Sequence, residues 1–288
     1  MRDQAETLRQ MKNNGLGQPV APTRVISVTS GKGGVGKSNL ALNTTIALSR
    51  LGLRAGILDA DLGLANIDIL LGMVPQYNLS HVIYGYRRIS DVILQGPDDI
   101  KVIAGTSGVD DLANLTPWRL QRFTKALEEL DRQLDVLLID TGAGINHNVL
   151  SFLLASDEIM VVITNEPTSI TDAYGLIKVL ANKNVTPKIS LIVNMVRNAR
   201  EGREVADKLR FVVSRFLKRD IDYLGCVPHD EAVIRAIQQQ KPLLEVAPRS
   251  QAARAINNLA LALADEQGAP RTGVGNLFQR MFKLFAKS

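Results

Sequence analysis

The chain has 288 residues and a net charge of +5, and it is 45% apolar and 22% charged. This composition is that of a folded globular protein and excludes a disordered chain. No apolar run approaches the ~20 residues that span a bilayer, and we expect no secretory signal. The single cysteine, Cys226, excludes an intramolecular disulfide and an iron–sulfur cluster held by this chain alone.

The positive charge gathers at the C-terminal end of the chain. Residues 271–288 contain four cations and no acid, which leaves 30 Lys and Arg against 29 Asp and Glu in residues 1–270. A nearly neutral body with a basic tail favours a local anionic partner, and we expect no direct sequence-specific binding to nucleic acid.

The order of apolar and polar segments predicts one α/β domain. Residues 1–23 form a polar arm that ends in a breaker-rich stretch, so we expect the arm to be flexible. From residue 24, short β-branched apolar runs alternate with segments of helical period, which predicts a mostly parallel central sheet with helices on both faces over residues 24–266. The predicted strands are 25–29, 55–59, 101–104, 136–140, 159–164, 189–194 and 221–227. The predicted helices are 39–51, 117–133, 169–183, 201–217, 230–239 and 250–266.

A glycine-rich loop follows the first predicted strand. Its sequence, Gly31-Lys32-Gly33-Gly34-Val35-Gly36-Lys37-Ser38, fits the P-loop pattern G-x-x-x-x-G-K-[ST]. The glycines allow backbone N–H groups to surround phosphate oxygens, and the next helix begins with its positive end toward them. We expect Lys37 to bridge the β- and γ-phosphates, Ser38 to bind Mg²⁺, and Asn39 to lie beside the nucleotide. The sequence therefore predicts a P-loop NTPase that binds ATP or ADP with Mg²⁺.

Carboxylates close two other predicted strands. Asp59 and Asp61 lie two residues apart, so on an extended chain both face the same way and could meet a metal ion and its waters. Asp140 ends a buried run in the manner of a Walker B strand. Ligands of open parallel sheets bind outside the carboxyl ends of the strands, where the loop, Asp59 and Asp140 all fall. The predicted metal-binding residues are Ser38, Asp59 and Asp140. For Asp59 and Asp61, the alternative is that both carboxylates cap the next turn.

The last segment is amphipathic. Residues 267–273 form a predicted linker, and residues 274–288 a helix with its apolar side chains on one arc. The predicted membrane-facing set is Leu277, Phe278, Met281, Phe282 and Phe285, flanked by Arg280 and Lys283. A basic, aromatic-rich helix of this kind predicts an interfacial membrane anchor, in which each cation contributes ~1 kcal/mol at an anionic surface. The alternative is a terminal helix docked on the domain, and both hold if the helix docks when no ATP is bound.

Three features together resemble the MinD/ParA class of deviant Walker A ATPases. They are Lys32, which ordinary P-loops do not require, the run from Leu58 to Asp68, and the C-terminal helix. The resemblance implies that Lys32 reaches the phosphates of a partner across a nucleotide-sandwiched dimer, and that Asp61 positions the attacking water. It also implies that Asn194 and Pro228 contact the adenine, although both residue types are common in turns as well.

More narrowly, the run from Asn165 to Tyr174 and the pattern Asp-Gln-Ala-x-x-Leu-Arg near the start resemble the FlhG family, also called FleN or YlxH. The residues of that pattern, a predicted partner-binding motif, are Asp3, Gln4, Ala5, Leu8 and Arg9. The resemblance implies a slow, Mg²⁺-dependent ATPase that regulates flagellar number and placement. It implies a homodimer with ATP and a monomer otherwise, in the cytoplasm and reversibly at the inner face of the cell membrane. The implied partners are an FlhF-type SRP GTPase and either flagellar C-ring proteins or a flagellar transcription activator.

Three other functions compete with this interpretation. A division-site MinD is the nearest, and the N-terminal pattern and the run from Asn165 to Tyr174 speak against it. A ParA-type partition ATPase that binds DNA would carry a distributed basic face, which the near-neutral body disfavours. A nucleotide-sensing scaffold without hydrolysis would require that Asp61 or Lys32 be dispensable.

Overall fold

The computed structural model describes residues 21–61, 66–105, 116–183, 187–266 and 271–285. The predicted partner-binding motif at the start of the chain lies outside these residues, as does most of the predicted linker. Within them, eight strands form one sheet in the order β3-β4-β2-β5-β1-β6-β7-β8. The strands are β1 (Arg24–Ser30), β2 (Ala55–Ala60), β3 (Ile93–Gln95), β4 (Lys101–Ile103), β5 (Val136–Ala143), β6 (Glu158–Ile163), β7 (Lys188–Val196) and β8 (Asp222–Pro228).

The sheet confirms the predicted α/β class. All neighbouring strands pair in parallel except β3 and β4, which are antiparallel at the edge. All seven predicted strands are present, with ends that differ by one to three residues. Strand β3 was not predicted, because its three residues, Ile93–Gln95, are too few to show a strand pattern.

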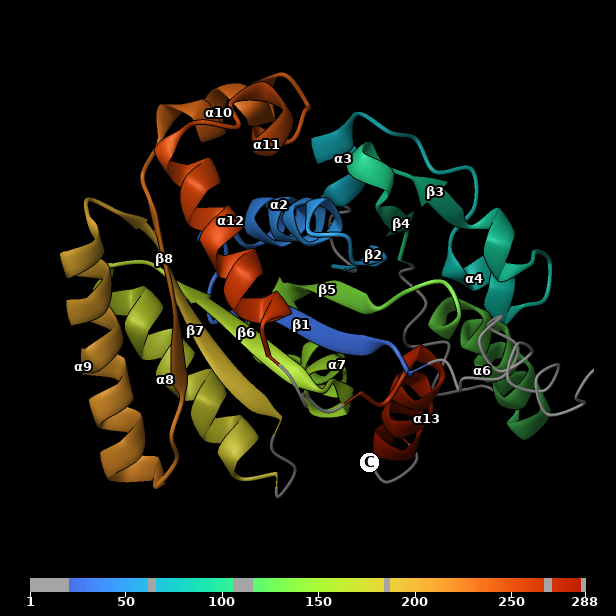
Figure 1. Ribbon diagram of the computed structural model, residues 1–288. Coiled ribbons are helices and arrows are strands. Elements are labelled where there is room, and N and C mark those ends of the chain that lie inside the picture. Colours follow the sequence, from blue (N-terminus) through green and yellow to red (C-terminus); the bar gives the residue numbers. More distant parts are fainter. Residues whose placement is uncertain (1–20, 62–65, 106–115, 184–186, 267–270, 286–288) are drawn as a thin grey trace, which may run out of the picture.

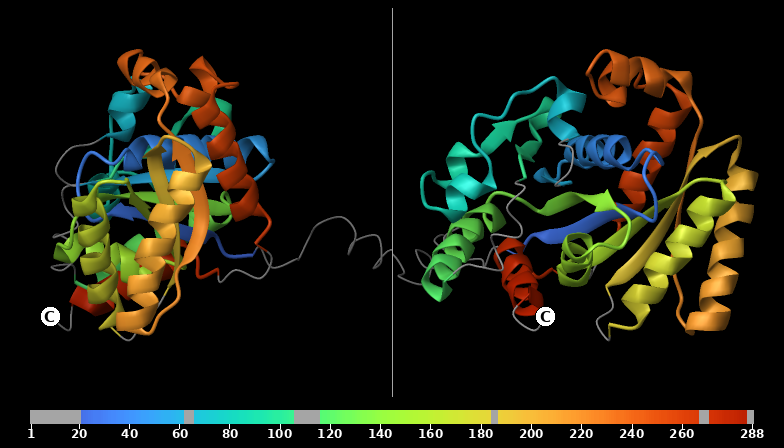
Figure 2. Two further views of the ribbon diagram at one scale, coloured as in Figure 1. Left: turned by 90° about the vertical axis from the view of Figure 1, so that its left-hand side faces the viewer. Right: turned by 180° about the vertical axis from the view of Figure 1, so that it is seen from behind.

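Helices cover both faces of the sheet (Figures 1 and 2). The first face carries α2 (Lys37–Arg50), α10 (Glu231–Gln238), α11 (Leu243–Val246) and α12 (Gln251–Ala264), with α3 (Ile67–Leu71) beside α2. The second carries α6 (Pro117–Asp131), α7 (His147–Ala155), α8 (Pro167–Ala181), α9 (Ala199–Leu217) and α13 (Val274–Phe285). Helix α4 (Leu79–Ile83) and two 3-10 turns, Ile89–Asp91 and Pro97–Asp99, complete the end near β3.

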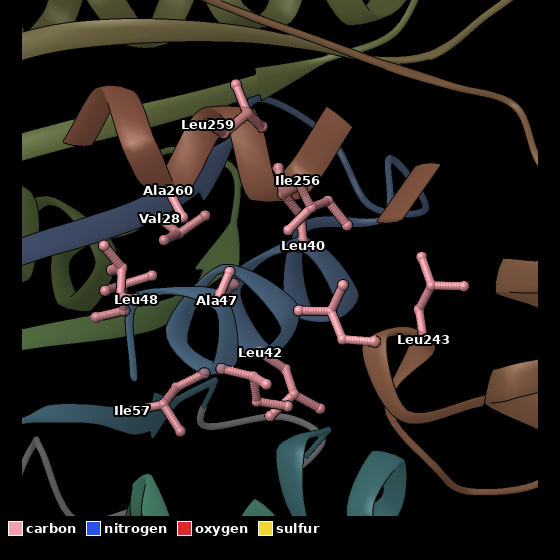
Figure 3. Packing of buried hydrophobic residues seen from close by; sticks show 14 of the residues in the cluster. Val28, Leu40, Leu42, Ala47, Leu48, Ile57, Leu243, Ile256, Leu259 and Ala260 are labelled. Atoms are coloured by element: carbon pink, nitrogen blue, oxygen red, sulfur yellow. The ribbon is translucent and has the colours of Figure 1, made fainter. Parts of the chain in front are cut away.

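Helix α2 is the best-buried helix of the first face, and it fixes the loop that precedes it. Leu40, Ala47 and Leu48 of α2 are buried on the first face of the sheet (Figure 3). Helix α12 lies beside α2 on that face, where its Ile256 and Leu259 belong to the same buried cluster. Each fully buried Leu or Ile contributes roughly 1.5–3 kcal/mol, so the beginning of α2 is held firmly against the carboxyl ends of the strands.

The C-terminal helix is docked on the domain. Val274, Leu277, Phe278 and Met281 of α13 are buried in one cluster with side chains of α6 and α7. The ring of Phe278 meets the ring of Phe123 edge to face at 5.3 Å between centroids. Of the predicted membrane-facing set, Phe282 is half-buried, Arg280 and Lys283 are exposed, and the side chain of Phe285 lies outside the described part. The alternative that the sequence left open, a docked helix, is thus the one present in this structure.

Hydrogen bonds fasten the beginning of α13. Asp157 accepts the hydroxyl of Thr272 at 2.7 Å and its backbone N–H at 3.3 Å. Asp131, the last residue of α6, accepts the backbone N–H of Val274 at 2.8 Å. The end of α6 and the loop before β6 therefore hold the entry to α13 at the amino ends of the strands. Among the described helices, none is long and apolar enough to cross a membrane.

Candidate nucleotide site

The phosphate loop connects β1 to α2 at the carboxyl edge of the sheet. Gly34 and Gly36 both have φ of +81°, a left-handed conformation that glycine adopts without strain. A Cβ on Gly31 would lie 2.4 Å from the backbone carbon of Asp172 in α8, so only glycine fits there. The loop is therefore curled as a phosphate cradle requires, with the N-terminus of α2 behind it.

The loop lysine meets the predicted Walker B carboxylate in a buried ion pair. Lys37 Nζ lies 2.5 Å from Asp140 Oδ1 and 3.4 Å from the hydroxyl of Ser38. Both members of the ion pair are buried, and burial raises the pKa of Asp140 while the Lys37 ammonium opposes that rise. The other oxygen, Asp140 Oδ2, has no hydrogen-bond partner within the described residues. A buried carboxylate oxygen of this kind needs a cation or a water.

The aspartates after β2 differ in their surroundings. Asp59 is buried and accepts the backbone N–H groups of Asp61, Asn66 and Ile67, at 3.1, 2.8 and 3.0 Å. Burial raises the pKa of Asp59 to about 6, although these N–H groups lower it. Asp59 therefore joins the end of β2 to the beginning of α3 through these hydrogen bonds.

Asp61 is partly exposed and borders the end of β5. Its Oδ2 accepts from the side chain of Asn66 at 3.3 Å. Its Oδ1 lies 3.4 Å from the place that a Cβ on Gly142 would occupy. Because β5 also carries Asp140, the structure brings the loop, Asp59, Asp61 and Asp140 to one edge of the sheet.

The second lysine of the loop points away from that cluster, toward α8. Lys32 Nζ is paired with Glu166, the residue before α8, and lies 3.2 Å from the hydroxyl of Thr168. Both side chains of the ion pair are partly exposed. Sequence reasoning did not identify Glu166 or Thr168 as site residues, because no pattern relates a loop lysine to a residue more than 130 positions away.

An apolar pocket of about 150 Å³ opens beside the loop. It is lined by Asn39 and Leu40 of α2, the ends of β7 and β8 with Asn194, Met195 and Pro228, and Val233, Ile234 and Ile237 of α10. The predicted base-contacting residues Asn194 and Pro228 therefore lie together. The amide of Asn194 donates to the carbonyl of Val35 at 2.8 Å, so this side chain holds the loop as well. The sequence did not predict the contribution of α10, although its amphipathic pattern was visible.

The oxygen donors fit a magnesium ion. Within the described residues, no group of three His, Cys, Asp or Glu side chains forms a protein cage for a metal. Mg²⁺ in nucleotide sites commonly takes one or two protein oxygens together with phosphates and water. The Ser38 hydroxyl and the unpartnered Asp140 Oδ2 are donors of this chemistry.

Comparisons with known proteins agree with this geometry. Residues 21–264 match the model of the ParA family, described as "NUBPL iron-transfer P-loop NTPase". The antiactivator FleN of Pseudomonas aeruginosa is 43% identical over 83% of this chain and 85% of its own. The flagellum site-determining protein YlxH of Helicobacter pylori is 34% identical over 91% of this chain and 90% of its own. The MinD of Pyrococcus horikoshii OT3 complexed with Mg-ADP superposes with a TM-score of 0.67, at 26% identity, over 84% of this chain and 96% of that one.

Proposed function

Because this chain belongs to the ParA family of P-loop NTPases and, within it, to the FlhG group of FleN and YlxH, we propose that it is an ATP-hydrolysing switch of flagellar number and placement. One observation carries the proposal: a P-loop with two lysines faces three strand-end aspartates at one edge of the sheet. The chain's single cysteine gives it no paired thiolates for the iron transfer that the family description mentions.

In the first step, ATP enters the phosphate loop. The triphosphate offers Lys37 an anionic partner in place of Asp140. A bound Mg²⁺ ion would compensate the charge of Asp140, so that neither member of the former ion pair would be buried alone. Ser38 and Asp140 would hold the ion directly or through water, with Asp59 supporting the segment next to it. The metal supplies neutralisation of the phosphate charge. The base fills the apolar pocket next to Asn194 and Pro228.

The second step is dimerisation. The proposed dimer places the nucleotides between two copies of the chain. ATP favours the dimer because it binds the dimer more tightly than the monomer. Lys32 leaves Glu166 and reaches the phosphates of the partner copy, where its charge acts as an arginine finger does. The Lys32–Glu166 pair is partly exposed, so breaking it costs about 1 kcal/mol at most.

Hydrolysis then ends the bound state. Asp61, partly exposed at the site edge, is the residue that we assign to orientation of the attacking water. Loss of the γ-phosphate removes the partner of Lys32, which returns to Glu166, and the dimer separates. Lys37 returns to Asp140 once ADP has left the loop. We expect slow turnover without a partner protein, so that the enzyme acts as a timer.

Membrane attachment follows from the C-terminal helix. In the monomer its apolar side chains occupy the groove between α6 and α7. In the ATP dimer two helices become available together, and two weak anchors on one particle bind a surface far more tightly than one. Arg280 and Lys283 are exposed on α13 and suit anionic headgroups. The protein is therefore proposed to move reversibly between the cytoplasm and the inner face of the cell membrane.

The flagellar role rests on the relatives. FleN is named an antiactivator and YlxH a flagellum site-determining protein, and these names support a role in flagellar placement. The proposed partners are an FlhF-type GTPase through the N-terminal arm, and C-ring proteins or a transcription activator. A division-site role, as the name of MinD suggests for that relative, is the second candidate.

The test is sedimentation with anionic vesicles in ATP and in ADP. The full chain and a chain that ends at Pro270 are compared, with light scattering to measure dimerisation. We expect only the full chain to pellet, and only with ATP, while both chains dimerise. Pelleting that ignores the nucleotide, or persists without residues 271–288, would contradict the proposal.

A further inference from the structure

A cluster of exposed aromatic rings and arginines lies at the end of the molecule formed by α4 and the first half of α6. We name it the aromatic–arginine face. It consists of the exposed residues Tyr84, Tyr86, Arg87, Arg88, Trp118, Arg119, Arg122 and Lys125, with half-buried Tyr77 at its edge. The nucleotide site uses none of these side chains. Trp118 is 65% exposed and Tyr86 is 71% exposed, and exposed apolar side chains that gather in one patch mark a contact surface.

The rings and guanidinium groups of this face are ordered against one another. Tyr84 and Tyr86 stack at 6.0 Å between centroids. The guanidinium carbon of Arg122 lies 5.8 Å from the centre of the Trp118 ring, and its nitrogens lie 2.9 Å from where a Cβ on Gly85 would be. Arg122 therefore joins α6 to the turn that carries the two tyrosines, and the face is one surface rather than scattered side chains.

Its charge is of one sign. Residues 77–88 and 116–125 contain five Lys and Arg and no Asp or Glu. Within the described part of the chain, none of these five cations forms an ion pair. Arg87 instead lies over the ring of Tyr77, at 4.3 Å from its centre. The cations are thus available to an anionic surface, while the body of the protein as a whole is nearly neutral.

The position of the face selects a lipid surface as the partner. Trp118, Arg122 and Lys125 are exposed and lie four and three residues apart, so they share one side of α6. Helix α6 also contacts α13, which lies next to it in Figures 1 and 2. Because the backbone carbonyl of Thr124 lies 3.4 Å from where a Cβ on Gly275 would be, the beginning of α13 lies beside the middle of α6, next to Lys125. A membrane that receives α13 therefore comes close to the aromatic–arginine face. Trp and Tyr rings with Arg are the side chains that favour the headgroup region.

We propose that the aromatic–arginine face is a second membrane contact, which seats the domain on anionic headgroups once α13 has inserted. The inference rests on the proposed function, because it needs α13 at a membrane. Each cation near an anionic surface contributes about fivefold in affinity, so the face makes attachment depend on lipid charge as well as on the apolar helix. It also fixes the orientation of the domain, which one flexible helix cannot do.

The single tryptophan makes a direct test possible, because all indole fluorescence comes from Trp118. The full chain in ATP is mixed with vesicles of phosphatidylcholine and phosphatidylglycerol, with and without brominated acyl chains. We expect emission of Trp118 to shift to the blue and to be quenched by the brominated lipid. Emission in ATP without vesicles, and with phosphatidylcholine alone, provides the baseline.

A pair of variants tests the cations. Arg119→Gln with Lys125→Gln removes two exposed charges whose side chains make no described contact, and we expect vesicle affinity to fall by about 25-fold. The matched control is Lys208→Gln with Arg215→Gln on α9, beside the opposite edge of the sheet, where we expect less than about a twofold change. Hydrolysis in solution checks that both variants fold.

The outcomes separate this inference from the function on which it rests. Two results overturn this inference and leave the proposed function standing. One is that vesicle-bound protein shows no quenching of Trp118, and the other is that the Arg119→Gln/Lys125→Gln variant binds vesicles with wild-type affinity. Loss of affinity for duplex DNA in that variant, with vesicle binding unchanged, also overturns it and assigns the face to nucleic acid. No vesicle binding by the wild-type chain in ATP overturns the membrane switch itself, and this inference with it.

Discussion

The two edges of the sheet hold their functional groups in different ways. At the carboxyl edge, Lys37 and Lys32 are engaged by Asp140 and Glu166 of the same chain. At the amino edge, the apolar side of α13 is engaged by the groove between α6 and α7. At both edges, residues of the same chain bind a group that has another partner in the proposed function. The lysines would bind phosphates, and the apolar side of α13 would bind a membrane.

The difference lies in what can replace the internal partner. A phosphate oxygen replaces a carboxylate oxygen with little change in free energy, so ATP alone can rearrange the carboxyl edge. Leu277, Phe278 and Met281 each contribute roughly 1.5–3 kcal/mol by burial, and water cannot replace their groove. Only another apolar environment can, so we expect α13 to leave its groove at the membrane and not in solution.

The largest effect is expected at the carboxyl edge, from Lys37→Ala. Removal of this charge takes away the cation that neutralises the phosphates, and we expect hydrolysis to fall by about 10²–10³-fold with weakened ATP binding. Steady-state phosphate release and fluorescent-nucleotide titration measure the two effects. The control is Lys208→Ala, at an exposed position of α9. An equal loss of hydrolysis in both variants would contradict a role of Lys37 at the phosphates.

Asp61→Ala separates hydrolysis from binding. We expect about 10²-fold slower hydrolysis, because the attacking water loses its orienting carboxylate, while ATP affinity and ATP-dependent dimerisation persist. Phosphate release and light scattering on the same sample distinguish the two. Retained hydrolysis would favour the nucleotide-sensing scaffold over an enzyme.

At the amino edge, Thr272→Val removes the hydroxyl that donates to Asp157. The loss of one hydrogen bond, about 1 kcal/mol, raises the undocked fraction of α13 by about fivefold. We therefore expect vesicle affinity to rise by the same factor, in ADP as well as in ATP. Ser49→Ala, which removes a hydroxyl bonded to the Asp98 carbonyl on the other face, should leave vesicle binding unchanged.

The smallest effect is expected from Glu166→Gln, which frees Lys32 without touching the phosphate loop. Because an exposed ion pair is worth about 1 kcal/mol at most, the ATP-dependent dimer should tighten by no more than about fivefold. Sedimentation equilibrium in ATP measures the dimer dissociation constant. Glu204→Gln, which breaks an exposed ion pair with Arg200 on α9, is the matched control. A weaker dimer in Glu166→Gln would place Glu166 in the interface instead of in the resting monomer.

Much of the carboxyl edge could be predicted from the sequence. The P-loop is a local pattern, and the rule that parallel strands meet a ligand at their carboxyl ends brings Asp59 and Asp140 to it. The partners of the lysines could not be predicted, since a long flexible side chain can meet any carboxylate that the fold places in reach. Helix α7 was missed for a related reason: its nine residues adjoin β6, and a short apolar run does not distinguish a helix from a strand.

The amino edge was harder to predict. An apolar arc with exposed cations suits a membrane and a protein groove equally well, so the pattern of α13 left both open. The groove itself consists of Phe123 and Leu127 of α6 and Phe152 of α7, two helices that the buried strand β5 separates in the sequence. Only the packed structure shows that these side chains match the helix and cover it.

The most direct test of the link between the two edges is to fasten α13 in its groove. A Cβ on Gly275 would lie 3.5 Å from Thr124 Cγ2, so Thr124→Cys with Gly275→Cys, in a Cys226→Ala background, places two thiols in disulfide range. Vesicle sedimentation in ATP is then measured for the oxidised and the reduced protein. We expect the oxidised protein to bind ATP and dimerise but to stay in the supernatant, and reduction to restore pelleting. Equal pelleting of both forms would contradict it.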